Sequence, residues 1–164
     1  MILRRVVYGL CVVMMMGAIF GFSSQTYEQT MKTSDVIVKP IENRVKEDSS
    51  NFESEKEEND YIKKLEDKLD KLVRKSAHMI VFGMLAVFVY LLCKSFGMSD
   101  ADAIIVTLVV CAVYAGTDEW HQKFVKGRTS QFVDVCVDEM GAVISMILVR
   151  ITVHININKL KGKY

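Results

Sequence analysis

The sequence has one proline, four scattered cysteines and almost no net charge. The formal net charge of +1 gives no reason to expect nucleic acid as a partner. No two cysteines form a C-x-x-C pair, so we expect small buried side chains and not disulfides or metal ligands. The chain also lacks an H-E-x-x-H pattern and a nucleophile-elbow motif, so the sequence does not indicate either of these hydrolase classes.

Apolar residues make up 51% of the chain, and they are gathered into runs instead of being spread with an amphipathic period. Such runs are typical of helices surrounded by lipid. We predict an all-α fold, that of a small polytopic membrane protein with about four transmembrane helices. The expected spans are residues 6–22, 76–93, about 101–118 and about 132–150.

The first apolar run, residues 6–22, follows Arg4 and Arg5. A cleaved signal peptide would also begin with basic residues and an apolar stretch. No A-x-A-like cleavage site follows the run, however, and seventeen uncharged residues are many for the apolar region of a signal peptide. We favour a membrane helix here, with the signal peptide as the alternative.

The fourth span has the shortest apolar run, because only ten uncharged residues follow Glu139 before the next charge. A span needs roughly 20 residues, so this one must begin near Phe132 and carry Asp134 and Asp138 toward the hydrocarbon. A carboxylate at mid-membrane costs about 2.5–3.5 kcal/mol, and such groups normally face a protein interior or a wet cavity. An amphipathic re-entrant or interfacial helix is the alternative.

Two small residues share a helix face with two of these acids. In chain order the four are Asp134, Asp138, Gly141 and Ser145, which follow one another at steps of four, three and four residues. A small-x-x-x-small pair lets a neighbouring helix approach closely. The neighbour is either a helix of the same chain or a second copy, so a homo-oligomer through Gly141 and Ser145 is one expectation.

Four spans alternate in direction, so the end of the first, the start of the second, the end of the third and the start of the fourth lie on one side. Most of the polar residues that flank the spans lie at these four ends. We predict one polar cluster at the membrane boundary, where lower polarity strengthens ionic contacts. Besides Ser23, its candidate functional residues are Ser24, Gln25, Lys75, His78, Asp118, Glu119, His121, Gln122, Arg128, Asp134 and Asp138.

Basic residues favour cytoplasmic N- and C-termini in a multi-pass protein of the cell membrane. Arg4 and Arg5 precede the first span, Lys94 follows the second, and a basic tail ends the chain. By the positive-inside rule these segments are cytoplasmic, which puts the polar cluster outside.

The predicted organisation has four parts: a first transmembrane helix at 1–22, an extramembrane loop at 23–75, a core of three transmembrane helices at 76–153 and a basic tail at 154–164. The loop begins with residues that include a charged spacer, 42–60, which has too few apolar side chains to fold alone. An amphipathic helix from residue 61 then leads into the second span.

Four polar motifs follow one another along the chain: FSSQ at 22–25, RKSAH at 74–78, DEWHQKFVKGR at 118–128 and DVCVDEMGA at 134–142. Together they resemble those of the VanZ-like family of bacterial membrane proteins, named for a protein associated with resistance to the glycopeptide antibiotic teicoplanin. This chain departs from the family pattern at Val81 and Phe82, where a Glu and a Tyr are frequent, at Lys126, where Pro is frequent, and at Asp138, where Asn is common.

The resemblance implies a bacterial envelope protein with a part in teicoplanin tolerance, and it brings no established reaction. We favour a site that binds or modulates envelope lipids or lipophilic glycopeptide antibiotics, with Lys75 and Arg128 pairing anionic groups. On this account the protein is not an enzyme and needs no cofactor and no metal. The other expected partner is the lipid bilayer.

Two other accounts are open. A membrane enzyme acting on a lipid-linked envelope substrate would use a histidine as general base beside a carboxylate that orients it or binds a divalent metal. A purely structural network would use the same polar groups to hold short helices together. The catalytic candidates under the enzyme account are His78, Asp118, Glu119 and His121.

Overall fold

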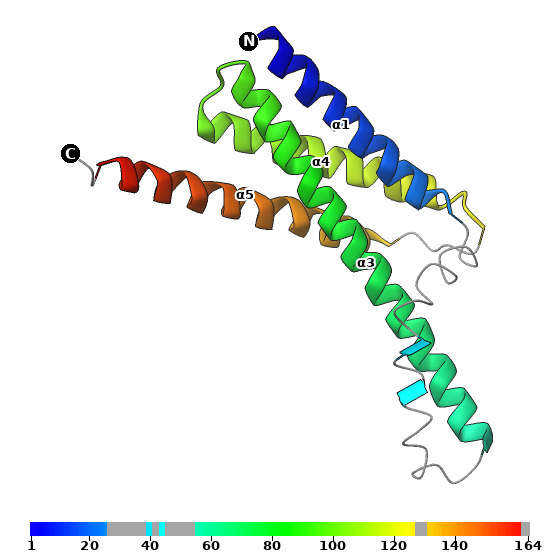
Figure 1. Cartoon of the computed structure of the whole chain (residues 1–164). Coiled ribbons are helices and arrows are strands. Elements are labelled where there is room, and N and C mark those ends of the chain that lie inside the picture. The colour runs from blue at the N-terminus through cyan, green and yellow to red at the C-terminus, as the bar shows by residue number, and fades with distance from the viewer. Residues whose placement is uncertain (26–38, 41–42, 45–54, 127–130, 162–164) are drawn as a thin grey trace.

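The protein is a bundle of helices, as Figure 1 shows. The computed structural model describes residues 1–25, 39–40, 43–44, 55–126 and 131–161. No strand occurs in these ranges, which confirms the prediction of an all-α fold. The helices are α1 (Ile2–Ser23), α3 (Glu55–Ser95), α4 (Asp100–Gln122) and α5 (Phe132–Lys161).

Helix α3 is the centre of the bundle, because it packs against α1, α4 and α5. Its side chains Phe82, Leu85 and Ala86 are fully buried. Figure 1 shows the N-terminal half of α3 running well past the other helices. The predicted amphipathic segment from residue 61 is therefore continuous with the span that follows it, and residues 55–60 of the predicted spacer already belong to this helix.

Apolar side chains cover the outside of the bundle. Exposed examples are Val13 on α1, Val109 and Val113 on α4, and Leu148 on α5. Three helices of the described chain, α1, α3 and α4, are long and apolar enough to cross a membrane. Lipid is the surrounding in which such a surface is stable, so these helices indicate a membrane protein.

Helix α5 is not among those three, and its first turns contain Asp134, Asp138 and Glu139. It is long enough to span, with 30 residues, and it extends to Lys161, into the predicted basic tail. The fourth span and its interfacial alternative both remain predictions.

Asp100 on α4 contacts both α3 and α5, at the end of the bundle that lies opposite the predicted cluster. Its carboxylate pairs with Lys94 Nζ at 2.6 Å and with Arg150 Nη1 at 3.5 Å, and it accepts a hydrogen bond from the Tyr90 hydroxyl at 3.2 Å. Nearby, Arg5 Nε donates to the Ser95 carbonyl at 3.1 Å. Contacts from the start of α1, the end of α3, the start of α4 and the second half of α5 therefore meet at this end.

Close contact between α3 and α5 depends on glycine. A Cβ atom on Gly141 would overlap the Met79 carbonyl group, and one on Gly83 would lie 2.6 Å from Ser145 Oγ. The small face predicted from Gly141 and Ser145 therefore contacts α3 of the same chain. A homo-oligomer through this face, which stays a prediction, would have to displace α3.

We expect Gly141→Ala to lower the thermal midpoint of the detergent-solubilised protein by several degrees. The added methyl group would force α3 and α5 apart, and overpacking of this kind costs about 1–3 kcal/mol. Gly17→Ala is the matched control, since a Cβ atom there would meet nothing within 4 Å. Equal midpoints for the two variants would contradict the importance of this helix contact.

Candidate functional site

Polar side chains from all four helices converge at one end of the bundle. Ser23 ends α1, His78 lies midway along α3, and Asp118 lies near the end of α4. Asp138 lies in the second turn of α5. His78 Nδ1 is 4.0 Å from Asp118 Oδ2 and 3.8 Å from Asp138 Oδ2. Residues predicted at the start of the second span, the end of the third and the start of the fourth therefore lie together.

Asp118 is the most buried acid of this group, with a side chain that is 1% exposed. Its Oδ2 atom accepts hydrogen bonds from Ser23 Oγ at 2.7 Å and from Gln122 Nε2 at 2.9 Å. Its other oxygen, Oδ1, is buried and has no hydrogen-bond partner in the described structure. One oxygen of this carboxylate is thus held firmly, and the other retains free lone pairs.

His78 lies between the two carboxylates and is packed against Phe82. The two rings are stacked, with centroids 6.5 Å apart and an interplanar angle of 26°. Asp138 is 3% exposed, so its carboxylate faces the imidazole inside the protein and not the surrounding solvent or lipid. An imidazole between two buried carboxylates can hold a proton or a metal ion.

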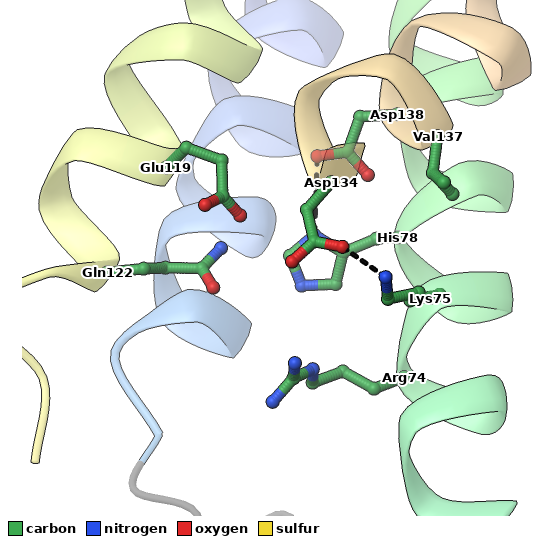
Figure 2. Close-up of a pocket in the computed structure, with 8 residues that line it drawn as sticks. All are labelled: Arg74, Lys75, His78, Glu119, Gln122, Asp134, Val137 and Asp138. Carbon is green, nitrogen blue, oxygen red and sulfur yellow. Dashed lines mark ion pairs between the residues drawn. The ribbon is translucent and has the colours of Figure 1, made fainter. Parts of the chain in front are cut away.

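A pocket beside His78 is lined by basic and acidic side chains, as Figure 2 shows. Lys75 forms an ion pair with Asp134, across the gap between α3 and α5. Arg74 lines the same pocket, and its guanidinium group extends into the open space below His78 in Figure 2. Among the described residues no ion pair to Arg74 is found, so this cation is available to an anionic ligand.

His121 lies where α4 meets the end of α1, and it does not line the pocket beside His78. Its Nε2 atom is 3.2 Å from Ser24 Oγ, and its ring stacks on Phe20 with centroids 4.5 Å apart. Gln25 follows the end of α1, where its backbone N–H donates to the Phe22 carbonyl. These contacts hold α1 against α4 but do not extend the set around His78.

Glu119 connects α4 to the start of α5. Its Oε2 atom accepts a hydrogen bond from the Gln131 backbone N–H at 3.1 Å, and its side chain lines the pocket of Figure 2. The remaining candidate, Arg128, lies outside the described residues, and its predicted role in anion binding stays a prediction.

A second, apolar groove runs between α4 and α5, with a volume of about 870 Å³. Glu119 lines both this groove and the charged pocket, so the two spaces adjoin. Glu139 Oε2 is buried in the groove wall without a hydrogen-bond partner in the described structure. Other lining residues are Gly116, Trp120, Phe132, Val135, Cys136, Met140 and Val143.

Sequence reasoning did not single out Arg74 or the groove. Arg74 entered the sequence analysis only as the first residue of the RKSAH motif at 74–78, because it lies in a run of lysines and acids that is typical of a solvated helix face. The groove depends on how far α4 and α5 separate, which no local pattern reveals. The buried position of Ser23, in contrast to exposed Ser24, follows from the direction in which α1 faces α4.

Comparison with protein families confirms the resemblance seen in the motifs. No curated protein and no solved structure matches the chain. A family model described as VanZ/LLP1 matches residues 7–153, which is most of the 164 residues and includes every helix that contributes to the cluster. The chain therefore belongs to the VanZ/LLP1 family.

Proposed function

We propose that this protein binds an anionic amphiphile of the bacterial envelope, either a membrane lipid or a lipophilic glycopeptide antibiotic such as teicoplanin. The observation that carries the proposal is the junction at Glu119, where a charged pocket adjoins an apolar groove. A ligand with a charged head and an acyl chain is the kind of molecule that would occupy both spaces.

Arg74 and Lys75 supply the head-group contacts. A guanidinium group binds phosphate or carboxylate through two parallel hydrogen bonds, and an ammonium group acts as a point charge. Lys75 is 32% exposed and already pairs with Asp134, so an incoming anion would compete with that carboxylate. Arg128 would add a third cation at the same boundary.

The groove supplies the acyl-chain contacts. Its walls include Trp120, Val135 and Val143, and its volume of about 870 Å³ is of the size that proteins use for small ligands. Trp120 is 64% exposed and lies near the end of α4, where an aromatic residue suits the membrane interface.

The proposal includes a multi-pass protein with the cluster outside and both termini in the cytoplasm. Arg5, Lys94 and Arg150 support this orientation, because they gather at the end of the bundle opposite His78. Positive charge is enriched on the cytoplasmic side of membrane proteins.

An enzyme acting on a lipid-linked substrate is the second candidate. His78 favours it, since a general base beside the carboxylate of Asp138 is a common catalytic pair. Under the purely structural account, the bonds of Ser23 and Gln122 to Asp118 would be the only role of these groups. The experiments below test the binding proposal and separate it from the structural account.

We expect brominated phosphatidylglycerol to quench the fluorescence of Trp120 more strongly than brominated phosphatidylcholine does, in vesicles containing the full chain. Trp120 is the only tryptophan and lines the groove, so quenching reports bromine in or beside it. Arg74→Gln combined with Lys75→Gln should remove the preference for the anionic lipid.

The matched control is Lys63→Gln combined with Lys64→Gln, two exposed basic residues on the same helix. This pair should leave the preference unchanged, because it lies more than two helical turns from the pocket. Equal quenching of the wild type by the two brominated lipids would contradict binding of an anionic amphiphile.

We also expect a susceptible host expressing the wild type to need several-fold more teicoplanin for growth inhibition, with vancomycin, which is less lipophilic, as control. Asp118→Asn should abolish the protection at a matched membrane level, because the carboxylate at the centre of the cluster loses its charge. Protection retained by Asp118→Asn would separate tolerance from this cluster. Loss of the folded protein would instead favour the structural account.

A further inference from the structure

We propose that His78, Asp118 and Asp138 form a binding site for one divalent transition-metal ion, with Zn²⁺ as the first candidate. One ligand atom from each residue lies within 4.8 Å of the others. This inference goes beyond amphiphile binding and does not depend on it, since the three ligands belong to the protein.

The distances suit a metal ion after a small movement. Bonds of about 2.1 Å in a tetrahedral arrangement place two ligand atoms about 3.4 Å apart. His78 Nδ1 lies 3.8 Å from Asp138 Oδ2 and 4.0 Å from Asp118 Oδ2, so each gap would close by about half an ångström. A rotation of a carboxylate about its side-chain bonds covers a shift of this size.

The local charge also favours a cation. Asp118, Glu119 and Asp138 are each no more than 4% exposed, and carboxylates removed from water need a compensating charge. Lys75 pairs with Asp134, and among the described residues the group that faces both Asp118 and Asp138 is His78. A divalent ion would offset both buried acids and leave the imidazole neutral.

The unpartnered oxygen of Asp118 is the second, independent observation. Oδ1 is buried and accepts no hydrogen bond in the described structure, which is costly for a carboxylate oxygen. Either oxygen of a carboxylate can bind a metal, and both can do so together. The 4.0 Å separation from His78 Nδ1 is measured to Oδ2, so an ion bound there would satisfy Oδ1 by binding both oxygens of the carboxylate.

Neighbouring groups hold the ligands as metal sites require. Ser23 Oγ and Gln122 Nε2 both donate to Asp118 Oδ2, which orients the carboxylate within the cluster. Phe82 stacks on His78 and restricts the imidazole. Hydrogen bonds to the ligands typically change metal affinity by 10–100-fold, so Ser23 and Gln122 are positioning residues for this site.

The ligand set indicates the class of metal. One imidazole nitrogen and two carboxylates suit Zn²⁺, Mn²⁺ or Fe²⁺, whereas Ca²⁺ requires six to eight oxygen ligands. Three protein ligands leave a further position for water or for an anionic oxygen. The charged pocket lined by Arg74 and Lys75 is also lined by His78 and Asp138, so an anionic oxygen could reach the ion from it.

We would purify the full chain in detergent, strip it with EDTA, and measure binding of Zn²⁺, Mn²⁺ and Mg²⁺ by equilibrium dialysis without added lipid or antibiotic. The expected result is about one Zn²⁺ per chain, with Mg²⁺ bound much more weakly. Asp138→Asn should weaken Zn²⁺ binding at least about 100-fold, and Ser23→Ala about 10–100-fold. Asp102→Asn, the same substitution at the opposite end of α4, should leave the affinity unchanged.

A measurement on the wild type keeps the test independent of folding defects in the variants. The chain loaded with Co²⁺ should show a paramagnetically shifted imidazole signal in its NMR spectrum after selective labelling of histidine. Absence of that signal, or equal Zn²⁺ affinity of Asp138→Asn and Asp102→Asn, would overturn the site. Because no lipid or antibiotic is added, such a failure would leave the proposed function standing, and loss of lipid preference would leave the metal site standing.

Discussion

The contact between Met79 on α3 and Gly141 on α5 sets the geometry of the whole polar cluster. Met79 is adjacent to His78, and Gly141 lies one helical turn after Asp138. The crossing of the two backbones therefore brings His78 Nδ1 to 3.8 Å from Asp138 Oδ2. A larger residue at 141 would separate them, because its Cβ atom would overlap the Met79 carbonyl group. A packing constraint between two helices therefore decides which polar groups can act together.

The cluster is stable only because the bundle gives its charges partners inside an apolar shell. Ser23 and Gln122 bond Asp118, His78 faces Asp138, and the buried apolar side chain of Phe82 packs beside His78. Ionic and hydrogen-bonded contacts are stronger where water is scarce, and unpartnered groups are correspondingly costly. The same environment explains why the buried oxygens of Asp118 and Glu139, which have no hydrogen-bond partner in the described structure, indicate where a ligand would bind.

Much of the fold could be predicted from local patterns. Apolar runs bounded by polar residues indicate each helix, and their alternation along the chain already places Asp118 and Asp138 on the same side as His78. In the structure the predicted cluster consists of a set around His78 and a separate contact at His121, a division that the sequence pattern did not predict. Asp118 and His121 both contact the end of α1, but Asp118 bonds Ser23 and lies 4.0 Å from His78, whereas His121 contacts Ser24 and stacks on Phe20.

The sequence by itself determined the helical class, the membrane character and the end of the bundle at which polar residues gather, since these depend on hydrophobic runs and on chain direction. Only the tertiary structure decided which groups touch. Helix rotation decides that Ser23, and not Ser24, donates a hydrogen bond to Asp118 and that Arg74 lines the pocket. Helix separation decides that a groove lies between α4 and α5. Those quantities arise from side-chain packing between segments far apart in the chain, as at Gly141 and Met79, and a local pattern does not contain them.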